Sequence, residues 1–97
     1  MPRVVQSPEA RNDLKEIVRY IARENESAAR KWRRQMSELF RKLARHKEIG
    51  ERRITATRHD LRRFTSRAYV VYFRPVTDGI EILRIFHGAR DYESLIE

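Results

Sequence analysis

The strongest constraint on the fold comes from two apolar segments, residues 69–73 and 80–87, which are separated by a short turn. The first contains only β-branched and aromatic residues, which strands favour, and Asp78-Gly79 is a typical hairpin signal between the two. Alternation along the second segment predicts that Ile80, Ile82 and Phe86 share one face of a sheet and that Leu83 and Ile85 share the other. Both faces of these strands are therefore apolar, and both have to be covered.

Two amphipathic helices are expected ahead of these strands. Ser7-Pro8 is a typical helix start, and Ser27 can cap a second helix after the break at residues 25–27. Because the connection is so short, the helices should lie antiparallel with their apolar stripes against one core. Gly50 should end the second helix. The stripes at helical spacing are Ala10, Leu14, Ile17, Val18 and Ile21, and then Ala29, Trp32, Met36, Leu39, Phe40 and Leu43.

The predicted order of elements is β-α-α-β-β-β, which places the chain in the α+β class. A short strand at Val4-Val5 opens it, the basic segment 51–60 is expected to be a loop or a ragged edge, and residues 61–66 start an antiparallel three-strand meander. The N-terminal strand joins the side of the meander, and the helical hairpin covers one face. The other face is left for a partner or for the C-terminal residues, and the sequence leaves both options open. At 97 residues we expect a single domain, residues 1–97.

Positive charge is concentrated in the middle of the chain. The net charge is +8; residues 28–74 hold fifteen basic and four acidic side chains, whereas residues 75–97 hold two basic and five acidic ones. Arginine supplies most of this charge, and its planar guanidinium suits carboxylate and phosphate alike. The pattern predicts an acidic partner, either nucleic acid or an acidic protein segment; the alternative is a solvated basic face.

Composition excludes several other kinds of chemistry. There is no cysteine, and His46, His59 and His87 lack the spacing of metal ligands, so we expect neither a metal nor a cofactor. No apolar run approaches the roughly 20 residues of a membrane span, and the first residues contain no apolar signal segment. We therefore expect a soluble, cytoplasmic protein with no membrane partner.

Polar side chains cluster where the last predicted strand ends, on the rigid support that functional sites favour. This cluster comprises His87, Arg90, Asp91 and Tyr92. His87 could act as a general acid or base, or could close the strand through a hydrogen bond to the loop. Arg90 and Asp91 can form a local ion pair. Arg84 lies within the apolar strand and needs a carboxylate partner, for which Asp91 and Glu81 are the candidates.

Four stretches carry a family resemblance: the helix start Ser7-Pro8-Glu9-Ala10, residues 46–53, the strand at 69–74, and residues 82–91, which close in His-Gly-x-Arg-Asp. Together with the element order, they resemble the ParE branch of the RelE/ParE toxin superfamily over nearly the whole chain. The resemblance implies the toxin of a type II toxin–antitoxin, or plasmid stabilisation, module that arrests growth by inhibiting DNA gyrase. It also implies a hetero-oligomer with a ParD-like antitoxin, through which DNA is contacted.

RelE-type relatives share this fold but cut messenger RNA on the ribosome, so the residues have to distinguish the two branches. Cleavage at a ribose 2′-OH needs a base, an acid and cations. In a nuclease these groups would be Arg63, Arg84, His87 and Tyr92. No lysine lies in the sheet half, and Arg52 and Arg53 stand where RelE-type sites usually have lysine or glutamate. Arginine is a poor general base, so we favour a gyrase-binding toxin over an mRNA endoribonuclease.

The favoured hypothesis assigns two surfaces and no catalytic residue. The target is expected to contact His87, Arg90, Asp91 and Tyr92, and the acidic antitoxin is expected to contact Arg52, Arg53, Arg58, Arg63 and Arg67. A basic nucleic-acid-binding module without toxicity is the third hypothesis.

Overall fold

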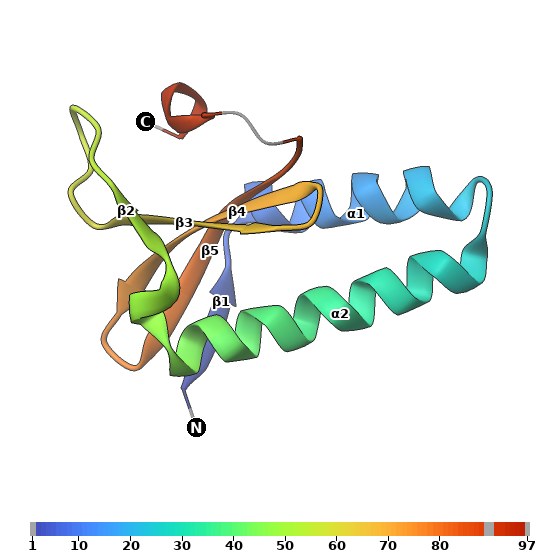
Figure 1. The fold of residues 1–97 in the computed structure, drawn as a ribbon, viewed down its shortest axis with the longest axis horizontal. Helices are drawn as coiled ribbons and strands as arrows, with labels where there is room; N and C mark the ends of the chain where they lie inside the picture. Colours follow the sequence, from blue (N-terminus) through green and yellow to red (C-terminus); the bar gives the residue numbers. More distant parts are fainter. Residues whose placement is uncertain (1, 89–90, 97) are drawn as a thin grey trace.

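The computed structural model describes residues 2–88 and 91–96 and confirms the α+β class (Figure 1). The two helices form a hairpin beside a sheet, and the C-terminal turn lies across the strands from them (Figure 1). In chain order the elements are β1 (Arg3–Gln6), α1 (Pro8–Ala22), α2 (Glu26–Arg45), η1 (Lys47–Ile49), β2 (Glu51–Arg53), β3 (Leu61–Ser66), β4 (Tyr69–Val76), β5 (Gly79–His87) and η2 (Glu93–Leu95).

The sheet has five strands in the order β1-β5-β4-β3-β2. The meander β3-β4-β5 is antiparallel as expected, and β1 joins its side by parallel pairing with β5, starting at Arg3 opposite Gly79. A Cβ at Gly79 would lie 1.7 Å from the Arg3 carbonyl oxygen, so only glycine permits this approach. Residues 51–60 contain both of the expected alternatives, because Glu51–Arg53 pairs with β3 as a short edge strand and the residues after it form no helix or strand.

A bulge in β5 changes which side chains face the helices. The register runs from Tyr72 opposite Arg84 to Phe73 opposite Ile82, which leaves Leu83 as the extra residue. The alternation therefore shifts, and Ile85 packs on the helix side whereas Phe86 packs on the other side. The sequence analysis assigned these two residues to the wrong faces of the sheet, because strict alternation along a strand does not account for the extra residue of a bulge.

Each face of the sheet carries its own apolar cluster. The larger one lies under the helices and includes Trp32, Met36, Phe40, Leu43 and Phe73, which confirms the predicted helix stripes. On the opposite face, the buried side chains are Leu61, Val70, Tyr72, Leu83, Tyr92 and Ile96. The C-terminal segment thus helps to cover the second face. This was one of the two possibilities that the sequence left open, the other being a partner.

Side-chain caps fix where the helices begin. The Ser7 hydroxyl oxygen accepts a hydrogen bond from the Ala10 N–H at 3.0 Å, as predicted. The second helix is capped by Asn25, whose side chain accepts from the Ala28 N–H at 2.9 Å. Ser27 lies inside that helix, so its expected role was wrong; both residue types cap well, and only the backbone path selects between them.

Beyond the end of β1, the start of α1 supplies hydrogen-bond partners to the edge of β5. After the parallel pairing ends at Ile82, the Ser7 hydroxyl donates to the Leu83 carbonyl at 2.9 Å, and the Ile85 N–H donates to Asp13 Oδ2 at 2.9 Å. The same buried carboxylate accepts from Arg84 Nε at 2.8 Å and Nη2 at 3.2 Å. Neither Asp91 nor Glu81 is the partner of Arg84: the structure corrects both expectations, since Glu81 pairs with Arg74.

Replacing Asp13 by alanine should destabilise the fold by about 3–5 kcal/mol, because it leaves the buried Ile85 N–H and the Arg84 guanidinium without their acceptor. Urea unfolding of wild type and variant measures the difference. Glu16→Ala, an exposed carboxylate removed from the same helix, is the matched control and should cost under about 1 kcal/mol. Equal losses in the two variants would show that Asp13 does not anchor β5.

Candidate functional site

Three rings form a column that leads from the core to the end of β5. Trp32 of α2 packs against Tyr69 of β4, with ring centroids 5.1 Å apart, and Tyr69 stacks on His87 at 4.9 Å. Trp32 is buried, Tyr69 is half-buried and His87 is exposed. This aromatic column holds the His87 imidazole at the surface on a rigid base, where it can meet a partner.

Tyr92 lies beneath the surface instead of on it. Its ring stacks on Phe86 with centroids 4.1 Å apart and an interplanar angle of 9°, and it is buried. Its hydroxyl lies 3.0 Å from the His87 carbonyl oxygen and 3.3 Å from that of Gly88. These contacts tie the C-terminal segment to the end of β5, so Tyr92 supports the position of His87.

Five charged side chains, Glu51, Arg53, Arg63, Asp91 and Glu93, form a tail clamp that fastens the C-terminal segment to β2 and β3. Arg53 is its centre: Nε donates to Glu93 at 2.7 Å, Nη2 to Asp91 at 2.8 Å and Nη1 to Glu51 at 2.8 Å. Arg63 donates to Asp91 and also lies 3.3 Å from Glu51. Two arginines and three carboxylates are thus largely satisfied within the molecule.

Tyr72 and Glu93, which meet on the second face, both have shifted pKa values. Burial raises the pKa of Tyr72, and the hydrogen bond that its hydroxyl donates to Glu93 at 2.6 Å raises it further. Burial alone would raise the pKa of Glu93, but the hydrogen bonds from Tyr72 and Arg53 outweigh it and hold that pKa below its ordinary value. The clamp therefore needs Glu93 ionised.

The four residues of the nuclease hypothesis have different partners. Arg63 is held by the tail clamp, whereas Arg84 is held by Asp13 of α1 and also lies over the Phe86 ring, 4.6 Å from its centroid. Tyr92 is buried and His87 is exposed. Each cation thus has a carboxylate against it.

The arginines expected to contact the antitoxin separate into two groups. Arg53 and Arg63 belong to the tail clamp, and Arg58 Nε donates to the Ile96 carbonyl at 3.4 Å. Arg52 and Arg67 have exposed side chains. Of the expected target residues, Asp91 is 66% exposed and His87 is exposed, and Arg90 lies outside the described residues.

Arg67 stands at the tip of the β3–β4 turn, beside a groove. Its φ of 55° is in the left-handed region, which costs a non-glycine residue about 1–2 kcal/mol. The groove, here called the hairpin groove, is lined by Trp32, Gln35, Met36, Leu39, Ser66, Arg67, Ala68 and Tyr69. It combines apolar walls with a cation at its rim, which suits a peptide that carries both apolar and acidic residues.

Sequence analysis missed Asp13, Glu51 and Glu93, which make many of the polar contacts around these surfaces. Asp13 lies on the same side of α1 as its apolar stripe. A carboxylate at such a position indicates that a buried hydrogen-bond donor or cation faces it. Within residues 2–88 and 91–96, no group of three His, Cys, Asp or Glu side chains is placed to hold a metal ion. None of the helices in that same part of the chain is long and apolar enough to cross a membrane.

Replacing Glu93 by glutamine should lower stability by about 1–3 kcal/mol at neutral pH, because a charged acceptor of Arg53 and Tyr72 is lost. The folded-state pKa of Glu93 is depressed, so its contribution is present above the ordinary glutamate pKa of about 4.3 and disappears as pH falls below it. Thermal unfolding from pH 7 to pH 3 should show wild type losing this advantage over the variant. Glu24→Gln, on an exposed turn, should track wild type; a constant gap between wild type and E93Q would remove Glu93 from the clamp.

Residues 4–92 match the family model described as the ParE toxin of the type II toxin–antitoxin system, parDE. No curated protein sequence shows a significant match to the chain. The family match spans nearly all of the fold described above, from β1 to Tyr92, and the order of helices and strands agrees with the RelE/ParE-like architecture. The chain therefore belongs to the ParE toxin family of type II toxin–antitoxin systems.

Proposed function

We propose that this toxin inhibits DNA gyrase by binding it in the cytoplasm, and that a cognate ParD-like antitoxin neutralises it by forming a hetero-oligomer. The observation that carries the proposal is that Arg63 and Arg84 are each neutralised by carboxylates of the same chain. Membership of the ParE family supplies the toxin and its antitoxin partner; the binding mode is argued from the side chains.

A ribonuclease of this fold would need free cations against the pentavalent phosphorane and an acid–base pair at the ribose. Arg84 is held in two hydrogen bonds by Asp13, and Arg63 shares its carboxylate partners with Arg53. A guanidinium that already faces a carboxylate contributes little to a developing phosphoryl charge. The buried Tyr92 has its hydroxyl against backbone carbonyls. This arrangement supports a binding protein over an RNA-cleaving enzyme.

The target surface proposed here is the outer end of β5. His87 presents its ring on the aromatic column, and Asp91 follows at the start of the clamped C-terminal segment. Arg90 is expected to belong to the same surface, although it lies outside the described residues. The proposal assigns recognition to shape and hydrogen bonding, with Tyr92 and the tail clamp as supports.

For the antitoxin we propose the hairpin groove together with Arg67 and Arg52. Apolar anchors inserted beside Trp32, Met36 and Leu39 would supply affinity, and acidic residues would pair with the exposed arginines. Arg53, Arg58 and Arg63 then act indirectly, because they hold the sheet edge and the C-terminal segment in place.

One observation favours the alternative of a RelE-like mRNA endoribonuclease. His87 is exposed at the end of β5, where a general acid or base could reach a bound nucleotide. The two functions make opposite predictions for this side chain, so one substitution separates them.

Purified toxin should inhibit gyrase supercoiling or trap cleaved DNA, and should leave ribosome-bound messenger RNA intact. His87→Gln keeps a polar side chain but removes the titratable proton, so inhibition should change by less than about tenfold, whereas a nuclease using His87 should lose about 10²–10⁴ in rate. His59→Gln, in an exposed loop, is the matched control. Messenger RNA cleavage by wild type that disappears only in H87Q would reverse the assignment.

Arg67→Gly should separate stability from antitoxin binding. Glycine adopts the left-handed conformation without strain, so the free energy of unfolding should stay the same or rise by up to about 1 kcal/mol. Association with the antitoxin should become slower and less dependent on salt, because an exposed cation is lost. Stopped-flow binding at two ionic strengths measures this, with Arg62→Gly as a comparison on the neighbouring strand. A variant that is more stable yet binds at an unchanged rate would exclude Arg67 from the interface.

A further inference from the structure

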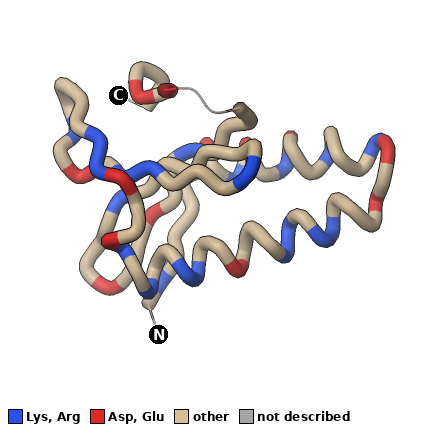
Figure 2. Tube along the Cα trace, in the orientation of Figure 1, with Lys and Arg blue, Asp and Glu red and all other residues tan. Residues whose placement is uncertain are grey.

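Much of the free positive charge of the described structure lies on α2, and less of it lies on the sheet. Across residues 2–88 and 91–96, five arginines of the sheet have carboxylates within ion-pair distance, and Arg52 and Arg62 do not; the five are Arg3, Arg53, Arg63, Arg74 and Arg84. No ion pair in that part of the chain involves a basic residue of α2. From Arg30 to Arg45 this helix carries seven basic side chains and one acidic one. In Figure 2, Lys and Arg positions recur along this helix between stretches of other residues.

Four of these residues form a stripe along the exposed side of the helix. Arg30, Arg34, Arg41 and Arg45 follow at spacings of four, seven and four residues, which return to the same side of an α-helix, and all four are exposed. At 1.5 Å per residue the stripe is roughly 22 Å long. Lys31 and Lys42 flank it, and we call the four arginines the arginine stripe.

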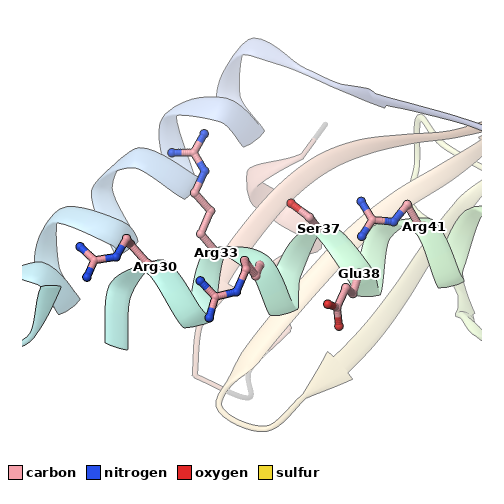
Figure 3. Close-up of a pocket in the computed structure, with 6 residues that line it drawn as sticks. Arg30, Arg33, Ser37, Glu38 and Arg41 are labelled. Carbon is pink, nitrogen blue, oxygen red and sulfur yellow. The ribbon is translucent and has the colours of Figure 1, made fainter. Parts of the chain in front are cut away.

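The surroundings of the stripe are polar. A shallow hollow along the helix is lined by Arg30, Arg33, Arg34, Ser37, Glu38 and Arg41, drawn as sticks in Figure 3. Ser37 offers a hydroxyl between the arginines, and Glu38 is the acidic residue on this side. The hollow has neither an aliphatic nor an aromatic residue in its lining. The apolar side of the helix, with Trp32, Met36, Phe40 and Leu43, is buried against the sheet.

We propose that the arginine stripe of α2 binds the phosphate backbone of double-stranded DNA without reading its sequence. A protein partner would need apolar anchors to obtain affinity, and the stripe has none. A single strand would need aromatic platforms for base stacking, which are also absent from this hollow. A duplex needs only cations at intervals along its backbone, and a 22 Å stripe spans about six base-pair steps.

This inference does not rest on the choice of cellular target. The proposed target surface is at the end of β5, and the proposed antitoxin site is the hairpin groove, which uses other residues of α2. The stripe would give the toxin its own contact with DNA, in addition to any contact made through the antitoxin.

The test is fluorescence anisotropy of a labelled 20-bp duplex of arbitrary sequence, titrated with the purified full chain between 50 and 200 mM salt. Each neutralised phosphate contributes about 0.9 to the slope of log K against log salt concentration. The double variant Arg34→Gln/Arg41→Gln should therefore reduce the slope by about 2. Both side chains are exposed and make no ion pair in the described structure, so circular dichroism should show an unchanged fold.

Two matched variants keep the outcome decisive. Arg11→Gln/Arg19→Gln removes the same net charge from exposed positions outside the stripe and should leave the slope within about 0.5 of wild type. Arg34→Lys/Arg41→Lys keeps the charge and should preserve the slope. Equal slope losses in the two Gln pairs would mean attraction by net charge alone and would overturn the proposal. An unchanged slope in Arg34→Gln/Arg41→Gln would also overturn the proposal, and it would do so even if this variant lost binding to the antitoxin.

Discussion

The buried carboxylate of Asp13 is the interaction on which the rest of the structure depends. It receives the Ile85 N–H and the Arg84 guanidinium directly after the bulge at Leu83, where β1 no longer pairs with β5. The bulge turns Ile85 toward the helices and Phe86 toward the opposite face. Phe86 then provides the ring on which Tyr92 stacks, and Tyr92 leads the C-terminal segment to the tail clamp. A contact between the first helix and the last strand thus decides how the far side of the sheet is closed.

Elements that depend on local patterns could be predicted from the sequence, and elements that depend on distant partners could not. The helix stripes and the strands β4 and β5 have strong periodicity, so their positions were correct. β2 is three charged residues whose strand character comes from pairing with β3 and from the opposition of Glu51 and Arg63. The partner of Arg84 is 71 residues away in sequence, and the nearer carboxylates at positions 81 and 91 are taken by Arg74 and by the clamp.

The same distinction applies to the candidate site. The exposure of His87 and Arg67 follows from their places at a strand end and at a turn, which the sequence indicated. The roles of Arg53, Arg63 and Tyr92 depend on where residues 91–96 fold, and no local pattern specifies that. Arginine-rich composition alone therefore overstates the surface that is free for a partner, since most of the sheet arginines are neutralised by carboxylates of the same chain. The unpaired charge can be located only after these internal ion pairs are subtracted, and α2 then carries many of the basic side chains that remain.

The parallel pairing of β1 with β5 has a consequence for how the chain acquires its structure. Residues 3–6 find their strand partners at residues 79–82, so the loop closed by this contact contains most of the chain. The helical hairpin and the antiparallel meander are assembled from contacts between near neighbours and can form early, whereas the first strand stays unpaired until the last one exists. During synthesis, β1 and the apolar side of the helices remain exposed until β5 has left the ribosome. An incomplete chain consequently lacks the folded sheet, and the surfaces attributed to the toxin arise only when its two ends meet.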